Sequence, residues 1–193
     1  MTLRRRIPST IVSGTDRERL LEIIKTKALQ FGEFTLSSGG TSNYYIDLRR
    51  ITFDGTAAPI LGRLIRELTA DLSLDAVGGP ALAAVPVADA VLHAAAAEGQ
   101  VLDAFAVRSA PKEHGTGRRI EGPDLAGRRV LVVEDTSTTG RSVLDAASAV
   151  VEAGAEVACV VAVADRGTGA GDAIRDAGYH YRFLFGPDEL GLT

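Results

Sequence analysis

The feature that most constrains the fold is a run of four apolar residues, Val130 to Val133, that ends in two adjacent carboxylates. Four consecutive apolar residues are typical of a strand buried on both faces, as in a parallel sheet covered by helices. Glu134 and Asp135 follow where we expect this strand to end. Small residues with hydroxyls come next, directly before an apolar-periodic run that begins at Val143. This order predicts a buried strand, a short loop and a helix.

The loop between this strand and this helix has the composition of an anion-binding site. A phosphate binds well to unpaired backbone N–H groups at the positive end of a helix dipole. Two carboxylates beside that phosphate would repel it unless the ligand also carries hydroxyls or a divalent cation. We therefore expect a sugar phosphate, bound where open α/β sheets place their ligands, at the carboxyl ends of strands. The residues that would form this cradle with Glu134 and Asp135 are Thr136, Ser137, Thr138, Thr139, Gly140, Arg141 and Ser142.

Composition excludes several other classes of protein. A chain of 193 residues is most simply one domain with one core, and its single cysteine, Cys159, lies in an apolar run and gives no disulfide framework. No apolar stretch approaches the roughly 20 residues of a membrane span, so we expect a cytoplasmic protein with no membrane partner. The net charge of −4 makes a nucleic-acid partner unexpected. Basic residues are dispersed except at Arg4 to Arg6 and between Arg108 and Arg119, and the second cluster suits a small anionic ligand.

The remaining chain predicts an alternation of strands and helices. Residues 1–14 are expected to be an arm with little structure, and a helix is expected from Thr15, with an apolar face that continues to Phe31. Further strands are expected at 34–36, 44–48, 75–78, 102–107, 156–164 and 179–185, and further helices at 55–72, 85–98, 143–154 and 171–177. The segment 108–127 is rich in glycine and is expected to be a long binding loop. This α/β pattern predicts a mostly parallel twisted sheet with helices on both faces.

Three segments of the chain resemble one enzyme family. The stretch 130–142, VLVVEDTSTTGRS, resembles the phosphoribosyl-pyrophosphate motif of type I phosphoribosyltransferases. The segment 34–50 resembles the hood of orotate phosphoribosyltransferases, and 108–122 resembles their mobile catalytic loop with its Lys-x-His-Gly core. The resemblance runs from about Thr15 to the C-terminus. It implies one phosphoribosyltransferase domain over 15–193, with a hood at approximately 15–50 and a core at approximately 51–193.

The resemblance assigns roles at the ribose phosphate and at the base. It implies that Glu134 and Asp135 hold the 2- and 3-hydroxyls of the ribose while the following loop wraps the 5-phosphate. Arg166 would pair with the carboxylate of orotate, since a guanidinium can hold a carboxylate through two parallel hydrogen bonds. Tyr44 and Tyr45 would wall the base pocket, although a half-buried strand pair is an equally good interpretation of these two residues. The base site would also include Thr138 and Ser37.

The resemblance also assigns the pyrophosphate side. Arg108, Ser109 and Lys112 would contact phosphoribosyl pyrophosphate. Lys112 supplies charge, and His114 can donate a proton or a hydrogen bond to the departing oxygens near neutral pH. We count Lys112, His114, Arg108 and Asp135 as the catalytic residues.

The implied activity transfers ribose 5-phosphate from phosphoribosyl pyrophosphate to orotate, which gives orotidine 5-phosphate and pyrophosphate in pyrimidine nucleotide biosynthesis. Mg²⁺ would be the cofactor, held mainly by the substrate and not directly by the protein. In the family the catalytic loop reaches the neighbouring subunit's active site, so a homodimer with shared sites is implied.

The sequence departs from the family pattern on the pyrophosphate side. Ser109 stands where the family usually has a lysine, Thr116 where it usually has a glutamate, and Leu82 and Ala83 where many members have a Tyr-Lys pair. Ser37 likewise occupies the position of a frequent base-contacting lysine. Two alternatives therefore stay open beside the enzyme: a divergent paralogue that binds phosphoribosyl pyrophosphate as a regulator, and an enzyme for another carboxylated pyrimidine.

Overall fold

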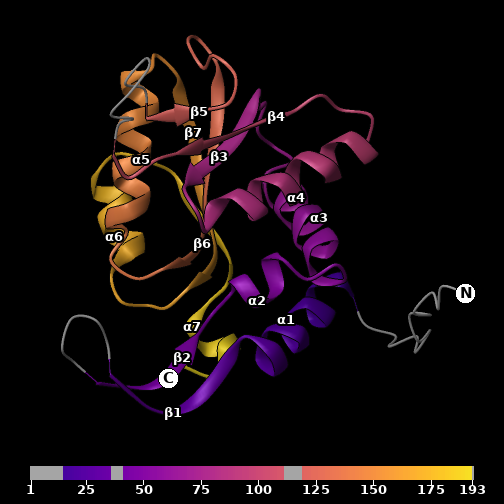
Figure 1. Cartoon of the computed structure of the whole chain (residues 1–193), viewed down its shortest axis with the longest axis vertical. Coiled ribbons are helices and arrows are strands. Elements are labelled where there is room, and N and C mark those ends of the chain that lie inside the picture. Colours follow the sequence, from indigo (N-terminus) through magenta and orange to yellow (C-terminus); the bar gives the residue numbers. More distant parts are fainter. Residues whose placement is uncertain (1–14, 36–40, 111–118, 193) are drawn as a thin grey trace, which may run out of the picture.

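The computed structural model describes residues 15–35, 41–110 and 119–192, and the predicted N-terminal arm lies outside this part of the chain. Seven helices and eight strands are formed by the described residues (Figure 1). The helices are α1 (Asp16–Lys27), α2 (Arg49–Thr52), α3 (Ala57–Leu68), α4 (Ala84–Ala97), α5 (Arg141–Glu152), α6 (Ala170–Asp176) and α7 (Pro187–Leu190). The strands are β1 (Leu29–Thr35), β2 (Thr41–Ile46), β3 (Ala76–Pro80), β4 (Asp103–Val107), β5 (Ile120–Glu121), β6 (Arg129–Ser137), β7 (Glu156–Asp165) and β8 (Tyr181–Phe185). No helix in the described ranges is long and apolar enough to cross a membrane.

The central sheet confirms the predicted α/β class. Its strand order is β5-β4-β3-β6-β7-β8, and every neighbouring pair is parallel except β4 with the two-residue strand β5. β3 lies between β4 and β6, although β6 comes after β4 in the chain. The chain therefore places β4 on one side of β3 and later places β6 on the other side. This reversal is a topological switch point, where open α/β sheets bind ligands outside the carboxyl ends of the strands.

Two helical layers cover the sheet, and the central strand alternates between them. Leu131 and Val133 of β6 belong to a core cluster with α1, α3 and α4, whereas Val130 and Val132 pack with α5 and α6. Figure 1 shows α3 and α4 on one side of the sheet and α5 and α6 on the other. All four of these β6 residues are fully buried. The apolar run therefore forms a strand because each residue has a helical layer to pack against.

The N-terminal elements form a small separate sheet, and the helix before it contacts the C-terminal elements. β1 and β2 pair antiparallel as a two-stranded sheet. The helix before them begins after Thr15, as predicted, and Thr15 and Glu18 form a capping box there. On α1, Arg17 donates from Nη1 to the carbonyl of Leu184 at 2.7 Å and from Nη2 to Glu189 at 2.6 Å. The first helix is thereby joined to β8 and α7.

Several predicted boundaries were wrong. The first helix ends at Lys27, and Phe31 lies in β1 with 66% of its surface exposed instead of on the helix's apolar face. Its backbone pairs with Tyr44 of β2, and this pairing takes the chain out of the helix. The strand predicted to end at Val133 continues to Ser137 because its pairing with β7 continues. The four-residue helices α2 and α7 and the short strand β5 were not predicted.

A single glycine sets how closely α3 and α4 approach. A Cβ placed on Gly62 would lie 2.1 Å from the carbonyl oxygen of Ala90. The two helices therefore pack with backbone against backbone at this point, which no larger residue permits.

We predict that Gly62→Ala destabilises the protein by about 2 kcal/mol. Alanine improves helix propensity by about 1 kcal/mol, but the overlap with the backbone of α4 outweighs this gain. Urea unfolding followed by circular dichroism measures the change. Gly55→Ala is the matched control, because a Cβ there meets nothing within 4 Å. An unchanged midpoint for Gly62→Ala would show that α3 and α4 are not closely packed.

Candidate active site

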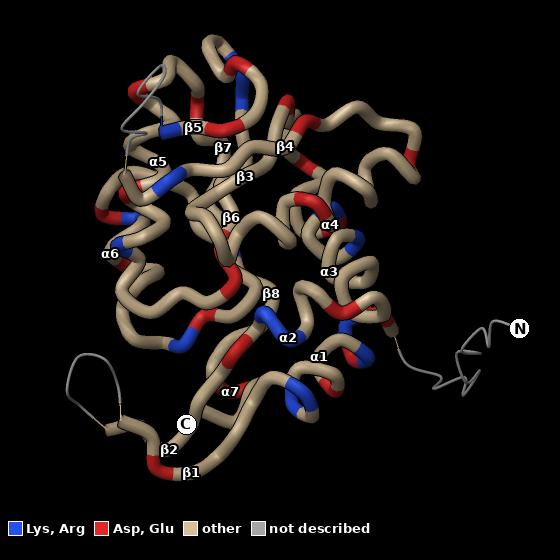
Figure 2. Tube along the Cα trace, viewed as in Figure 1, with Lys and Arg blue, Asp and Glu red and all other residues tan. Residues whose placement is uncertain are grey.

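The two carboxylates at the end of β6 lie within the strand and face opposite layers. Glu134 is in register with Ala162 of β7, and the pairing continues to Ser137 opposite Asp165. Successive strand residues point to opposite faces, so Glu134 continues the face of Val132 toward α5 and Asp135 continues the face of Val133. The neighbours agree, because Glu134 interacts with Ser142 of α5 and Asp135 with Arg49 of α2. Figure 2 shows acidic residues at this end of β6 and basic residues on α2.

Burial raises the pKa of both carboxylates. Glu134 is 8% exposed, and burial together with the negative charge of Asp135 raises its pKa to about 7, although a hydrogen bond with Ser142 opposes the shift. Burial also raises the pKa of Asp135, against the opposing effects of the Thr136 N–H, which donates to its Oδ1 at 2.6 Å, and of the Arg49 charge. The ionised form of such carboxylates is stabilised by a ligand that donates hydrogen bonds to them or by a cation beside them.

A cavity of about 520 Å³ lies where β6 meets α5. Gly140, at φ +74°, makes the left-handed turn that starts α5, which is a conformation that favours glycine. The cavity thus lies at the N-terminus of a 12-residue helix, where an anion is stabilised. Most of the predicted cradle residues line it, but Asp135, Thr136 and Ser137, which lie in β6 before the loop, do not. Its lining residues are Ser109, Glu134, Thr138, Thr139, Gly140, Arg141, Ser142 and Asp145.

The two ends of the basic loop are tied together at the rim of this cavity. The backbone N–H of Arg108 donates to the carbonyl of Arg119 at 2.8 Å, and Arg119 Nε donates back to the Arg108 carbonyl at 3.1 Å. The guanidinium of Arg119 forms an ion pair with Asp145 of α5, which lines the cavity. Arg108 also lies 3.5 Å from Glu121. The predicted loop therefore starts and ends beside the predicted phosphate site.

The structure brings together the two side chains predicted to bind the base carboxylate and wall the base pocket. Arg166 follows β7 and Tyr44 lies on β2, 122 residues apart, and Arg166 Nε donates to the Tyr44 hydroxyl at 2.9 Å. The guanidinium carbon lies 4.7 Å from the centre of the Tyr44 ring. Tyr45 is on the other face of β2, where its ring lies 5.7 Å from that of Phe34. Tyr45 therefore does not join the pair.

Three predicted site residues, Ser37, Lys112 and His114, lie outside the described residues. Sequence reasoning missed others that the structure places at the site. Asp165 was a recoverable case, because an aspartate at a strand end followed two residues later by glycine is typical of an Asx turn. Arg49 and Asp145 carried no sequence signal of their own, since each is an ordinary charged residue in a helix.

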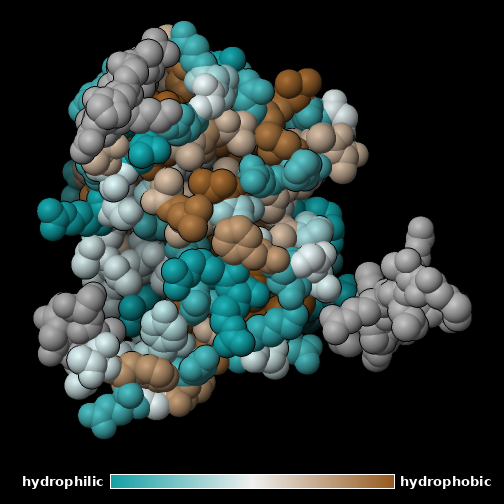
Figure 3. All heavy atoms as spheres, viewed as in Figure 1, coloured by the Kyte–Doolittle hydropathy of each residue, from teal (hydrophilic) through white to brown (hydrophobic). Residues whose placement is uncertain are grey.

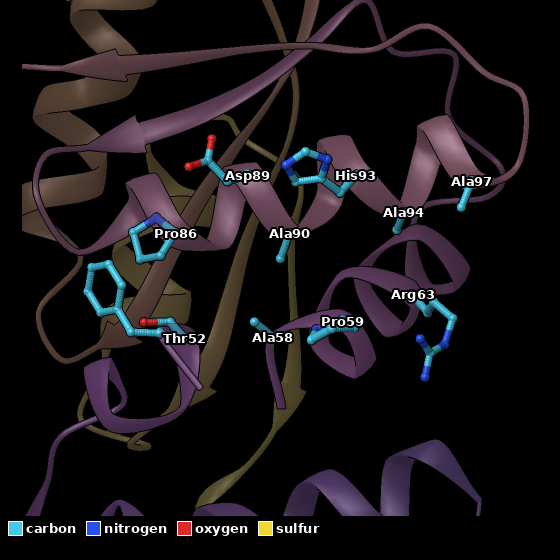
Figure 4. Close-up of a pocket in the computed structure, with 11 residues that line it drawn as sticks. Thr52, Ala58, Pro59, Arg63, Pro86, Asp89, Ala90, His93, Ala94 and Ala97 are labelled. Atoms are coloured by element: carbon cyan, nitrogen blue, oxygen red, sulfur yellow. The ribbon is translucent and has the colours of Figure 1, made fainter. Parts of the chain in front are cut away.

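A second cavity of about 410 Å³ lies between α3 and α4, away from the carboxylates (Figure 4). Its walls are mostly alanine and proline, with Arg63, Asp89 and His93 as its charged or titratable side chains. Phe53, 65% exposed, lies at this groove and adds a large apolar surface to it.

Comparisons with known proteins agree with this geometry. The family model for the phosphoribosyl transferase domain matches residues 56–186. The orotate phosphoribosyltransferase of Streptomyces coelicolor is 59% identical over 177 residues, 91% of this chain and 97% of that protein. That of Corynebacterium glutamicum strain ATCC 13032 is 51% identical over 96% of this chain and 99% of its own length. The crystal structure of Mycobacterium tuberculosis H37Rv orotate phosphoribosyltransferase in complex with 5-phospho-alpha-D-ribosyl 1-diphosphate is similar with a TM-score of 0.80 and 47% identity, covering 92% of this chain and 100% of that one.

We predict that Glu134→Gln changes how stability depends on pH. The folded protein holds a proton on Glu134 up to a pKa of about 7, against 4.5 for an ordinary glutamate. The wild type therefore loses stability as pH rises through this window. Glutamine does not titrate, so the variant should gain on the wild type by on the order of 2 kcal/mol between pH 5 and pH 8.

Urea unfolding of both proteins at the two pH values measures this gain. Asp145→Asn is the control, because its pKa is lowered by Arg119 and Asp145 is ionised at both pH values. Its stability difference from the wild type should be the same at pH 5 and pH 8. An equally constant difference for Glu134→Gln would contradict a raised pKa.

Proposed function

The chain belongs to the phosphoribosyltransferase family, and on that premise we propose that it is an orotate phosphoribosyltransferase. It transfers ribose 5-phosphate from phosphoribosyl pyrophosphate to orotate and releases pyrophosphate, a step of pyrimidine nucleotide biosynthesis. The observation that carries the assignment is the position of Arg166. Its backbone N–H donates to the carbonyl of Ser137 at 3.2 Å. The residue proposed to bind the orotate carboxylate is therefore bonded directly to the strand that leads into the phosphate cradle. The high identity to orotate phosphoribosyltransferases supports the enzyme and not a regulatory paralogue.

The cradle residues bind the donor. The cavity at the start of α5 takes the 5-phosphate, whose charge is stabilised by the helix N-terminus and by the N–H groups and hydroxyls from Thr138 to Ser142. Glu134 and Asp135 accept hydrogen bonds from the 2- and 3-hydroxyls of the ribose. Because the two carboxylates face opposite layers, the ribose lies across the end of β6. This placement leaves its anomeric carbon between the cradle and Arg166.

The chemical step exchanges two bonds at that anomeric carbon. The bond to the pyrophosphate oxygen breaks and its electron pair leaves with pyrophosphate, while a ring nitrogen of orotate forms the new bond and loses its proton to water or to the leaving pyrophosphate. The transition state resembles an oxocarbenium ion, as in glycoside hydrolysis. The carboxylate of Asp135 stabilises this positive charge. Arg166 fixes the orotate so that its ring nitrogen faces the carbon.

Lys112, His114 and Arg108 are proposed to act on the leaving pyrophosphate. Lys112 and Arg108 would neutralise its charge, and His114 would donate a proton or hydrogen bond to it. The ion pair of Arg119 with Asp145 supports this proposal, because it holds one end of the loop against the cavity. Ser109, which lines the cavity, can donate a hydrogen bond there where the family usually has a lysine.

Mg²⁺ is the proposed cofactor, and the donor groups at the cradle fit it. Magnesium keeps several waters and binds through one or two carboxylates together with substrate phosphates, and buried Glu134 and half-buried Asp135 stand at this cradle with raised pKa values. The ion would be held mainly by the oxygens of phosphoribosyl pyrophosphate, near Glu134 and Asp135, and it would neutralise charge on the leaving group. The proposed location is cytoplasmic, because a multiply charged substrate of this kind does not cross a lipid bilayer unaided.

We predict Mg²⁺-dependent consumption of orotate when the protein is given phosphoribosyl pyrophosphate. Arg166→Ala should lower kcat/KM for orotate by about 100-fold or more, since two charge-assisted hydrogen bonds are lost. The KM for phosphoribosyl pyrophosphate should stay within about twofold of the wild type. The loss of orotate absorbance follows the reaction. Arg128→Ala, which loses an ion pair with Asp103 at the opposite end of the sheet, is the control for losing an arginine. Tight donor binding without turnover would instead support the regulatory alternative.

We propose that the enzyme is a homodimer with shared active sites. A two-fold interface uses the same patch on both subunits, so the patch needs both a protruding and a receiving part. The groove between α3 and α4 provides the receiving part, and Phe53 and Leu82, 65% and 67% exposed, provide protruding apolar side chains. Figure 3 shows hydrophobic atoms gathered across this face, over the region of β3 and α4. An apolar surface of this kind supports an interface between two copies.

Hybrid dimers test the shared site. We predict that Asp135→Ala and Lys112→Ala proteins are each nearly inactive, and that unfolding and refolding them together restores about a quarter of wild-type activity, because half of the dimers then carry one complete site. A mixture of Asp135→Ala with Glu134→Ala is the control. Both substitutions damage the cradle, so no site is restored. Equal inactivity of the two mixtures would refute the shared site.

A further inference from the structure

The turn that carries Arg166 is fixed by a buried hydrogen-bond network that has no part in the proposed mechanism. Asp165, the last residue of β7, is 7% exposed and accepts two hydrogen bonds with its carboxylate. Oδ1 accepts from the N–H of Gly167 at 2.7 Å, and Oδ2 accepts from the hydroxyl of Tyr181 at 2.9 Å. Tyr181 is the first residue of β8 and is 9% exposed. The network therefore ties the turn to the neighbouring strand.

The Tyr181 hydroxyl keeps its proton in this position. Burial and the Asp165 carboxylate both raise the pKa of Tyr181 above its ordinary value. Because the hydroxyl keeps its proton, it remains a hydrogen-bond donor to Asp165. Gly167, at φ +69°, completes the turn in a conformation that favours glycine.

The same turn is bonded to the phosphate loop on its other side. The N–H of Arg166 donates to the carbonyl of Ser137, and the hydroxyl of Thr168 donates to the carbonyl of Thr138 at 2.6 Å. The backbone of Arg166 is thus fixed by β6 on one side and by Tyr181, through Asp165, on the other.

The side chain of Arg166 is held separately, from the small N-terminal sheet. Its Nε donates to the hydroxyl of Tyr44, which is 9% exposed, and the Tyr44 ring lies against the guanidinium. A guanidinium has five N–H donors in a planar fork, so four remain on Nη1 and Nη2. No described residue accepts from these two nitrogens, and the end of the fork is the edge that a carboxylate binds with two parallel bonds.

We propose that Tyr44 and Tyr181 are positioning residues for substrate recognition: their hydroxyls hold the side chain and the backbone of Arg166 so that Nη1 and Nη2 face the carboxylate of orotate. This inference rests on the proposed function and adds two specificity residues to it. Neither tyrosine hydroxyl touches the reacting atoms. Arginine loses much side-chain freedom when it binds a ligand, so an arginine already held in place binds its carboxylate more tightly.

Phenylalanine substitutions remove each hydroxyl and leave the ring. For Tyr44→Phe and Tyr181→Phe we expect the KM for orotate to rise roughly fivefold to twentyfold, while kcat and the KM for phosphoribosyl pyrophosphate stay within about twofold. Tyr179→Phe is the matched control, because its hydroxyl has no hydrogen-bond partner among the described residues and the variant should match the wild type. An unchanged KM for orotate in both variants, or an equal loss in all three kinetic constants, would overturn the proposal.

A double-mutant cycle distinguishes action through Arg166 from direct contact with the base. In an Arg166→Ala background, Tyr44→Phe and Tyr181→Phe should cause no further loss of kcat/KM for orotate. If either substitution keeps its full effect in that background, the tyrosine acts independently of Arg166 and the inference is wrong. Wild-type protein assayed in parallel distinguishes a failure of the proposed function from a failure of this inference. No turnover by the wild type overturns the proposed function and this inference with it, whereas normal turnover with additive losses overturns only the inference.

Discussion

The pairing of β6 with β7 is the interaction on which the site depends, because it continues beyond the apolar run to Ser137 opposite Asp165. Parallel strands that end at the same level place the residues after them side by side. The phosphate loop that starts at Thr138 and the turn that carries Arg166 are therefore neighbours, and Thr168 bonds one to the other. β3 leaves the pairing earlier, at Gly78 opposite Val132.

The site is formed at a cost in stability. Glu134 and Asp135 are neighbouring carboxylates that burial makes harder to ionise. A sequence selected only for stability would place apolar residues, or one charged residue instead of two, at the end of a buried strand. The sheet tolerates the pair because the four residues before it are completely buried between two helical layers. Folding energy in the middle of β6 thus offsets the strained electrostatics at its end, as is common at functional sites.

The sequence predicted what depends on local pattern and missed what depends on pairing partners. The run from Val130 to Val133 predicted the central strand, and Thr15 as an N-cap predicted the start of the first helix, because both signals are local in the sequence. The end of β6 was misplaced, since polar residues continue a strand when the neighbouring strand offers hydrogen bonds. Phe31 was assigned to a helix because an exposed strand phenylalanine is not distinguishable from an apolar helix position.

The same holds for the candidate site, where residues within one motif were predicted and contacts between distant residues were not. The motif identified the cradle residues that line the cavity, and the resemblance paired Arg166 with Tyr44 at the base. Nothing in the sequence indicated that Tyr181 reaches Asp165 or that Arg119 reaches Asp145, since these contacts join residues of ordinary type on elements whose spatial order the sequence leaves open. Tyr44 and Tyr45 stand next to each other in the chain but face opposite ways on β2, where strand alternation separates them.

The hydrogen bonds of Arg17 to Leu184 and Glu189 have a consequence for how the chain folds during synthesis. The helix that carries Arg17 is the first described element to leave the ribosome, but its partners on β8 and α7 are among the last. Domains generally fold as units as they emerge, so the contacts of this helix with β8 and α7 form only once those two elements have been synthesised. Until then its buried face, with Leu20 and Ile24, lacks part of its final surroundings. This face of the helix is therefore completed late in folding, after most of the central sheet has been synthesised.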